Sequence, residues 1–423
     1  MTKNTFVRLA SLFGLLAILA LLITTALGVQ GQARTSSPAS ANSAVVLLSN
    51  PMHLLSGTKG SHPQQPSGRL STQGAQLLDG SGHPLTLRGA QIESPFNYIQ
   101  GWQSGTPVTR YLNPAVFQAM VQQYHMNELR LPISNWIYNL NPTKYLSLLD
   151  QVIQQANSAG LYVVLDLHDD AKSGSPYGGN AQMPKKQDLV FWQTIAAHYH
   201  SNPMLLFDLF NEPQVKGWST WLNGGGSIDG APIVGFQTMV NAVRATGAQQ
   251  IIIVEAGQAG DGGPQDKGWM TVGNETINDP NIMYSLHEYQ DVTLSAQQQD
   301  AKWGPILNHY PIYYGEWAVL PNGAGKSGAD HCKGISHDQA DAITNTFLNY
   351  MTSRNANWDA WQFEPYFLIQ SEKTFAPTTL NIPWTCGNSS NHAGMGTLIQ
   401  QFLASHSNFR KGALIRPFLP RGK

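Results

Sequence analysis

Charged residues are scarce in this sequence: Asp, Glu, Lys and Arg together make up 12% of its 423 residues, and the formal net charge is −1. No basic cluster recurs along the chain, so the long-range positive field that nucleic acids and anionic membrane surfaces require is missing. These deficits argue against a nucleic-acid-binding protein. The 42% of apolar residues is enough to bury a sizeable core, and the weakly charged surface fits a neutral polymer as partner.

Cysteine is almost absent, with Cys332 and Cys386 as the two examples. At most one disulfide can therefore form within the chain. In an oxidising compartment these two residues, at separate loop positions, are candidates for that disulfide. Two free, buried thiols are the alternative.

The first 33 residues are predicted to be a signal peptide or a membrane anchor. Lys3 and Arg8 precede an apolar run over residues 9–29, and a stretch of small residues follows that ends at Ala33. This order is typical of an export signal cleaved after Ala33, whereas the length of the run also suffices to span a bilayer. Either outcome places the rest of the chain outside the cytoplasm, and a membrane is expected only through such an anchor.

Residues 34–68 are rich in Ser, Pro and Gln and are predicted to be a disordered linker. Beyond it, over residues 69–423, eight apolar strand-like runs alternate with longer helix-like segments. The runs are Leu87–Ile92, Glu128–Ile133, Tyr162–Leu167, Leu205–Phe210, Gln250–Val254, Ile282–Leu286, Ile312–Tyr314 and Trp358–Phe363. The helix-like segments include Pro142–Ala159, Gln187–His200, Pro232–Thr246 and His337–Ser353, each with helical apolar spacing.

Eight such alternations predict a parallel sheet buried on both faces, whose commonest form is the closed (β/α)8 or TIM barrel. The alternative, an open doubly wound sheet, lacks its usual Gly-rich phosphate loop here. Residues 77–78 and 85–87 flank Asp79-Gly80 and predict a short N-terminal hairpin that caps the barrel floor. The sequence therefore predicts a single (β/α)8 catalytic domain over residues 69–423.

Active sites of such barrels lie at the carboxyl ends of the strands, and polar residues stand at those positions here. They are Arg130 on the second strand, His168 after the third, Asn211 and Glu212 after the fourth, His287 and Tyr289 after the sixth, Glu316 after the seventh and Trp361 on the eighth. Asp166 and Glu255 also occupy strand positions and are interpreted as structural partners inside the barrel.

Two of these residues, Glu212 and Glu316, have the chemistry needed to cleave a glycosidic bond. Hydrolysis passes through an oxocarbenium-like state, so one carboxylic acid protonates the departing oxygen while a carboxylate attacks the anomeric carbon. Strands four and seven face each other across the barrel mouth, where Glu side chains can approach to the roughly 5 to 5.5 Å of a retaining pair. We expect Glu316 to stay ionised beside Arg130 and Tyr289, and Glu212 to be the acid/base.

The remaining candidates are predicted to bind the sugar. Asn211 is expected to bond its 2-hydroxyl, His168 and His287 to orient the acid and sugar hydroxyls, and Trp361 to form the floor of the subsite. Further stacking candidates for a polymeric substrate are Trp102, Trp136, Trp218, Trp221 and Trp317. A metal cluster of His168, Asp169, Asp170, His287 and Glu288 is the alternative, but it leaves Asn211, Tyr289 and Trp361 unexplained and lacks the usual ligand spacings.

These motifs resemble glycoside hydrolase family 5, the family of cellulases and mannanases, from about Leu70 to the end of the chain. They stand here as Leu129-Arg130-Leu131-Pro132, Leu165-Asp166-Leu167-His168, Leu209-Phe210-Asn211-Glu212-Pro213, His287-Glu288-Tyr289, Tyr314-Gly315-Glu316-Trp317 and Trp361. The resemblance implies a retaining mechanism with Glu212 as acid/base and Glu316 as nucleophile, without metal or organic cofactor. Ala318 after Trp317 and the extra acid Glu288 depart from many relatives and leave the substrate subtype open.

We therefore expect an extracellular, monomeric endo-β-glycosidase that hydrolyses a β-1,4-linked glucan of the cellulose type. The nearest alternative is the same mechanism on β-mannan or xyloglucan, since loops decide tolerance at C2 and at branch points. A non-catalytic carbohydrate-binding barrel is a second alternative, against which the intact pair of Glu212 and Glu316 argues.

Overall fold

The structure is a computed structural model, and it describes residues 68–94, 112–169, 183–214, 217–228, 230–256, 264–289, 291–319, 337–365, 367–378 and 393–406. The predicted signal or anchor, nearly all of the predicted linker, and Trp102, Asp170, Cys332 and Cys386 lie outside these ranges. Within them, no helix has the length and apolar character needed to cross a membrane.

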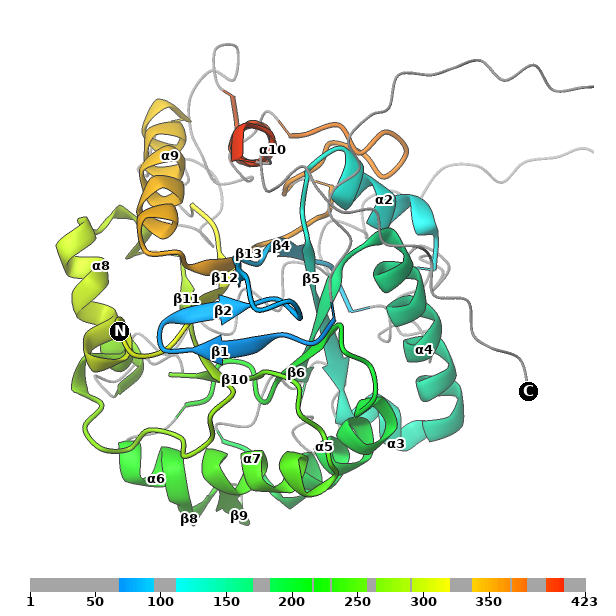
Figure 1. Ribbon diagram of the computed structural model, residues 1–423, viewed down its shortest axis with the longest axis vertical. Helices are drawn as coiled ribbons and strands as arrows, with labels where there is room; N and C mark the ends of the chain where they lie inside the picture. The colour runs from blue at the N-terminus through cyan, green and yellow to red at the C-terminus, as the bar shows by residue number, and fades with distance from the viewer. Residues whose placement is uncertain are drawn as a thin grey trace, which may run out of the picture.

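Eight parallel strands close into a barrel, as the sequence predicts (Figure 1). Each predicted run overlaps one of them, and the burial of nearly every strand residue explains the continuous apolar runs. In chain order the barrel strands are β4 (Arg88–Gln91), β5 (Glu128–Ser134), β6 (Tyr162–Asp169), β7 (Leu205–Asp208), β10 (Ile252–Glu255), β11 (Ile282–Glu288), β12 (Ile312–Trp317) and β13 (Asn357–Ala360).

Helices form a ring around the barrel (Figure 1). They are α2 (Pro114–Gln122), α3 (Asn135–Leu140), α4 (Pro142–Ala159), α5 (Lys186–Tyr199), α6 (Trp218–Asn223), α7 (Phe236–Ala245), α8 (Ala296–Trp303), α9 (His337–Ser353) and α10 (Met395–His406), with short 3-10 turns η4 (Pro264–Thr271), η5 (Asp291–Thr293) and η6 (Gly304–Ile306).

Local sequence sets the ends of α4, which spans the residues predicted for it. The Asn141 side chain accepts a hydrogen bond from the Lys144 amide, and Pro142 occupies the first helical position. Gly160 ends the helix with φ of 104°, a left-handed conformation that favours glycine.

The prediction that a helix starts at Pro232 is wrong. Residues Ala231–Val234 form strand β9, which pairs with the glycine-rich strand β8 (Gly224–Ile228) in an antiparallel hairpin. The helix α7 begins only at Phe236, after Gly235. Proline at the start of the segment suits a helix and an edge strand alike, so the local signal does not separate them.

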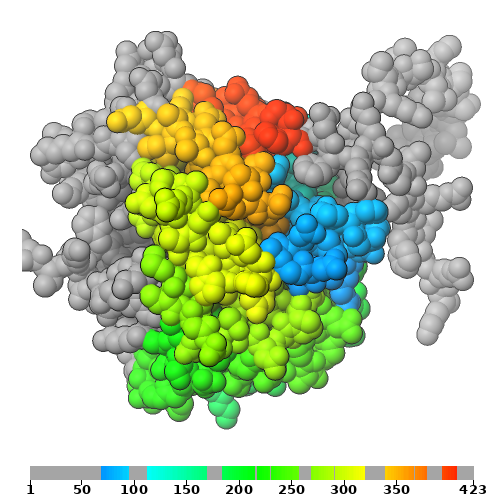
Figure 2. Space-filling view, turned by 60° about the vertical axis from the view of Figure 1, so that its left-hand side comes forward, coloured from blue at the N-terminus to red at the C-terminus, as the bar shows by residue number. Residues whose placement is uncertain are grey.

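The predicted N-terminal hairpin is present. Strands β1 (Ser71–Gln73), β2 (Gln76–Leu78) and β3 (Pro84–Leu85) form a small antiparallel sheet, which lies across the barrel opening in Figure 1 and at the surface in Figure 2. Leu70 and Leu77 pack there against Tyr162, Leu206 and other residues near the amino ends of the barrel strands. This apolar plug closes the barrel floor and leaves the opposite end for polar groups.

The floor contact can be tested with Leu77→Ala. Leu77 is 2% exposed, and a buried Leu→Ala change costs about 2 to 5 kcal/mol of unfolding free energy. Urea or thermal unfolding should show this loss, whereas Gln73→Ala, at an exposed position of β1, should unfold like the parent. Equal stability of the two variants would mean that the hairpin does not hold the floor.

Candidate active site

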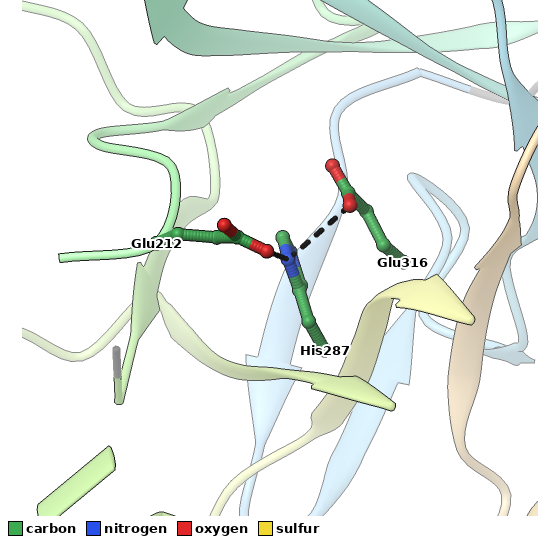
Figure 3. A group of neighbouring side chains, drawn as sticks. All are labelled: Glu212, His287 and Glu316. Atoms are coloured by element: carbon green, nitrogen blue, oxygen red, sulfur yellow. Dashed lines mark hydrogen bonds and ion pairs between the residues drawn. The ribbon is translucent and has the colours of Figure 1, made fainter. Parts of the chain in front are cut away.

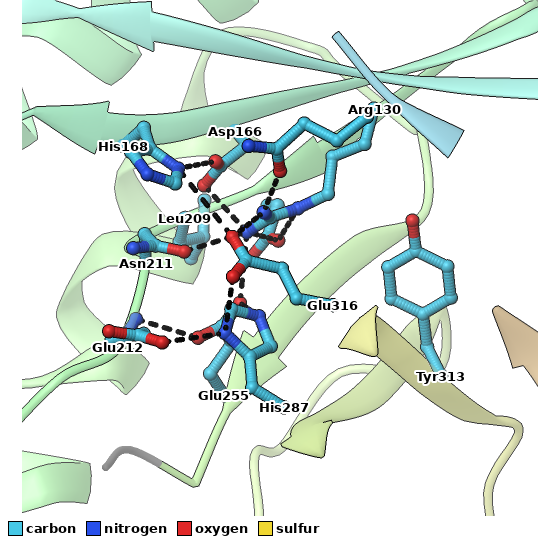
Figure 4. A network of polar contacts seen from close by, with 12 residues as sticks. Arg130, Asp166, His168, Leu209, Asn211, Glu212, Glu255, His287, Tyr313 and Glu316 are labelled. Atoms are coloured by element: carbon cyan, nitrogen blue, oxygen red, sulfur yellow. Dashed lines mark hydrogen bonds and ion pairs between the residues drawn. The ribbon is translucent and has the colours of Figure 1, made fainter. Parts of the chain in front are cut away.

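The carboxyl ends of the barrel strands bring the predicted site residues together (Figure 4). Arg130 comes from β5, His168 from β6, His287 from β11 and Glu316 from β12, while Asn211 and Glu212 lie three and four residues beyond the end of β7. The register of the parallel pair β11 and β12 sets His287 beside Glu316. Five separate strands therefore contribute to one cluster.

The two glutamates face each other with His287 between them (Figure 3). One oxygen of Glu212, one of Glu316 and a ring nitrogen of His287 all lie within 4.8 Å of one another. His287 Nδ1 is 3.1 Å from Glu212 Oε1 and 3.5 Å from Glu316 Oε2. The separation is in the range at which two carboxylates can act on the same anomeric carbon in a retaining reaction.

Glu316 is held as an anion. Its side chain is 4% exposed, and it accepts hydrogen bonds from Arg130 Nη1 at 2.7 Å and from the Tyr289 hydroxyl at 2.5 Å. Burial alone would raise the pKa of this carboxyl group, but the charges of His287, Arg130 and His168 together with the Tyr289 bond lower it below its usual value. An ionised, desolvated carboxylate has the character of a nucleophile.

Arg130 supplies part of this positive charge from a fully buried position. Its guanidinium lies 3.0 Å from Asp166, 3.1 Å from Asp208, 3.2 Å from Glu255 and 2.7 Å from Glu316. Burial together with the charge of Glu255 raises the pKa of Asp208 well above its ordinary value, although Arg130 opposes this shift. The charged form of Asp208 is therefore disfavoured in this crowded cluster.

Glu212 differs from Glu316 in both exposure and backbone. Its side chain is 29% exposed, so solvent and a substrate can reach it. Its φ is 49°, a left-handed conformation that costs a non-glycine residue about 1 to 3 kcal/mol. The Glu212 amide donates to Glu255 Oε2 at 2.7 Å, which helps to hold this conformation.

Four other predicted residues line the same end of the barrel. Asn211 Oδ1 accepts a hydrogen bond from Arg130 at 3.0 Å, and His168 Nδ1 contacts Asp166 at 2.7 Å. The half-buried Trp361 stacks on His168, with ring centroids 6.3 Å apart, and meets the Tyr289 ring edge-on at 6.4 Å. The Trp361 indole therefore contacts both His168 and Tyr289, where a sugar ring could pack on it.

The expectation that Trp317 stacks on substrate is corrected by its position. Successive strand residues point to opposite faces, so with Glu316 inside the barrel mouth Trp317 points outward. It is fully buried and packs edge-on against Phe347 and Trp358. Trp221 is also fully buried and Trp218 is 8% exposed, whereas Trp136 on α3 is half-buried.

Two acids assigned by sequence to a structural role turn out to contact site residues directly. Asp166 holds His168, and Glu255 contacts Arg130, His287 and the Glu212 amide. The available signal was that Asp166 interrupts an apolar strand run and Glu255 directly follows one, since acids are almost never fully buried unless paired.

The cluster of Glu212, His287 and Glu316 also has the donor atoms of a cation site. The Arg130 guanidinium already binds Glu316 at 2.7 Å, so a metal ion there would meet a neighbouring positive charge. The two carboxyl groups are the pair that acetal hydrolysis requires, and their geometry fits that chemistry.

The fold and the site together define the class of the protein, a (β/α)8-barrel glycoside hydrolase. The chain belongs to the family described as Cellulase (glycosyl hydrolase family 5), whose model matches residues 78–366. The resemblance found in the sequence motifs is thereby confirmed.

Curated relatives carry cellulase names. The chain is 24% identical over 341 residues to endoglucanase E-5 of Thermobifida fusca, covering 78% of this chain and 63% of that protein. It is 24% identical over 308 residues to cellulase/esterase CelE of Acetivibrio thermocellus, covering 66% of this chain and 34% of that protein. The chain thus spans about a third to just under two thirds of the length of these two relatives.

Solved structures support the fold. The beta-glucanase SdGluc5_26A of Saccharophagus degradans, in complex with cellotetraose, matches with a TM-score of 0.60 and 19% identity over 84% of this chain and 99% of that chain. The catalytic domain of Thermobifida fusca endoglucanase Cel5A matches with a TM-score of 0.56 and 18% identity over 81% of this chain and 100% of that chain.

The hydrogen bond from Tyr289 can be tested with Tyr289→Phe. Loss of a donor to the charged Glu316 should raise the pKa of that carboxyl group, so the acidic limb of the kcat/KM profile on an aryl β-glycoside should move to higher pH. We also expect kcat/KM to fall by about 10- to 100-fold, the range to which the loss of a hydrogen bond to a charged group corresponds.

The matched control is Tyr350→Phe, which loses a hydroxyl bonded to Asp300 at 3.1 Å outside the barrel. It should leave the pH profile unchanged. If Tyr289→Phe also left the profile unchanged, Tyr289 would have no part in keeping Glu316 ionised.

Proposed function

We propose that the protein hydrolyses internal β-1,4 bonds of a glucan of the cellulose type by double displacement, with net retention at the anomeric carbon. The observation that carries the proposal is a pair of carboxyl groups in unlike surroundings, with one oxygen of Glu212 within 4.8 Å of one oxygen of Glu316. Glu316 is buried and surrounded by donors, whereas Glu212 is partly exposed. The endoglucanase names of the relatives favour a glucan as substrate.

In the first step Glu316 attacks the anomeric carbon while Glu212 gives its proton to the departing glycosidic oxygen. As Glu316 becomes an ester it loses its negative charge, and its interactions with Arg130 and Tyr289 weaken. In the second step Glu212, now ionised, takes a proton from water, and the attacking oxygen releases Glu316. The same two residues therefore serve both halves of the cycle.

The other site residues are proposed to bind the reacting sugar and its neighbours. Asn211, held by Arg130 at 3.0 Å, is proposed to form a hydrogen bond with the 2-hydroxyl of the sugar. This contact strengthens in the transition state. His168 and His287 orient hydroxyls and the acid, and Trp361 offers an aromatic face to the pyranose. Among the described residues, the half-buried Trp136 is the predicted stacking candidate that we propose for a position further along the polymer.

The polymeric substrate fits a site of action outside the cell. A cellulose-type glucan is too large to enter a cell, and the apolar N-terminal run over residues 9–29 has the pattern of an export signal or anchor. We propose that the domain acts as an extracellular monomer, either released or held at the surface.

The roles of the two glutamates can be separated by azide rescue. Glu212→Ala should lose most activity on an unactivated glucan, and azide should restore turnover of an activated aryl β-cellobioside because the exposed alanine site admits the anion. The product should be the β-glycosyl azide, detected by NMR. An α-glycosyl azide would reverse the assignment of the nucleophile.

Glu316→Ala is the companion variant and should lose hydrolysis of carboxymethyl cellulose altogether. A panel of β-glucan, β-mannan and xyloglucan, with product sizes followed over time, tests the substrate. Early release of mixed oligosaccharides from the β-glucan is expected, whereas binding without turnover on every member of the panel would contradict the enzyme assignment.

A further inference from the structure

A third carboxylate lies behind the catalytic pair and contacts both sides of it. Glu255, the last residue of β10, is 2% exposed. Its Oε2 accepts the Glu212 amide at 2.7 Å, and its Oε1 lies 2.9 Å from His287 Nε2 and 3.2 Å from Arg130 Nη2 (Figure 4). The two carboxylate oxygens of Glu255 thus have different partners.

The barrel register brings Glu255 to this position. Strand β10 pairs with β7, with Ile253 opposite Asp208, and with β11, with Glu255 opposite Ser285. The end of β10 therefore lies between the turn that carries Glu212 and the strand that carries His287. Trp221 Nε1 donates to the Glu255 carbonyl oxygen at 2.9 Å, so the residue is anchored from outside the barrel as well.

The contact with the Glu212 amide bears on the backbone of that residue. Glu212 has φ of 49°, a conformation that persists in a non-glycine residue only when the surroundings fix it. A hydrogen bond from a backbone N–H to an ionised carboxylate is of the strong, charge-assisted kind. Loss of this acceptor would free the turn and let the Glu212 carboxyl group leave its place opposite Glu316.

The contact with His287 bears on the side chain of Glu212. Glu255 Oε1 lies 2.9 Å from His287 Nε2, while the other ring nitrogen, Nδ1, faces Glu212 at 3.1 Å and Glu316 at 3.5 Å. Burial would lower the pKa of His287, but Glu255, Glu316 and Glu212 together raise it well above its ordinary value. His287 therefore lies between the carboxyl groups of Glu255, Glu212 and Glu316, which together favour its charged form.

The other groups facing Glu255 favour its ionised form. Burial would raise its pKa, but His287, Arg130 and the Glu212 amide lower it to about 2. Burial and the charge of Glu255 raise the pKa of Asp208, on the neighbouring strand, well above its ordinary value. The negative charge of Glu255 is thus a fixed part of the site.

We propose that Glu255 is a positioning residue for proton delivery: through the Glu212 main chain and through His287 it aims the acid/base at the departing oxygen. It does not touch the reacting atoms. The inference rests on the proposed function, because it assigns Glu212 as the proton donor. It replaces the purely structural role expected for Glu255 from the sequence.

The test compares two substrates with the parent protein and Glu255→Gln. Gln keeps the shape and can still accept the Glu212 amide, but it removes the charge that holds His287. A dinitrophenyl β-cellobioside needs little protonation to lose its leaving group, whereas a short unactivated cello-oligosaccharide needs it fully. We expect kcat/KM to fall at least about 10-fold more on the oligosaccharide than on the activated substrate.

Asp208→Asn is the matched control. Asp208 is equally buried and contacts Arg130 at 3.1 Å, but no hydrogen bond or ion pair joins it to Glu212 or His287 among the described contacts. Its effect should be equal on the two substrates. Glu255→Asp, which keeps the charge one methylene shorter, should recover part of the selective loss and serves in place of Glu255→Gln if that variant does not fold.

Equal losses on both substrates in Glu255→Gln, or no loss on either, would overturn the positioning role. A parent protein that hydrolyses neither substrate would instead overturn the proposed function. The two failures are therefore distinct.

Discussion

The Arg130 guanidinium is fully buried, and oxygens of Asp166, Asp208, Glu255 and Glu316 lie within 3.2 Å of it. Removing one charged residue from a buried cluster leaves its partners without a counter-charge. The free energy lost in this way is far larger than the net stabilisation that the intact interaction provides. The position of Arg130 on β5, at the centre of the barrel, lets acids from four other strands share it. This shared cation helps an anionic nucleophile to exist at a buried position.

The two ends of the barrel have different roles: the floor contributes to stability, and the mouth carries the chemistry. At the floor, Leu70 and Leu77 of the hairpin close an apolar layer with residues of the strands. At the mouth, charged groups replace that layer, and Glu212 holds a left-handed backbone that the surrounding bonds must stabilise. Strain of this kind is tolerated where the rest of the fold fixes it, and a packed floor provides such a frame.

Much of the fold could be predicted because its signals are local. Continuous apolar runs gave the barrel strands, and Asn141 with Gly160 marks the ends of α4. The start of α7 was missed because Pro232 suits a strand as well as a helix. The contacts of Glu255 were out of reach, since they depend on how β10 aligns with β7 and β11. Trp317 was misjudged because its motif was considered without the alternation of side chains along β12.

The central claim is that Glu316 forms a covalent bond with the sugar. The most direct measurement is mass spectrometry after incubation with a dinitrophenyl 2-deoxy-2-fluoro-β-cellobioside, whose fluorine slows release of the glycosyl-enzyme intermediate. The account predicts one added fluorocellobiosyl unit per chain, mapped to the peptide that contains Glu316. A label on Glu212 or Glu255, or continued hydrolysis of a glucan with inversion and no label, would contradict it.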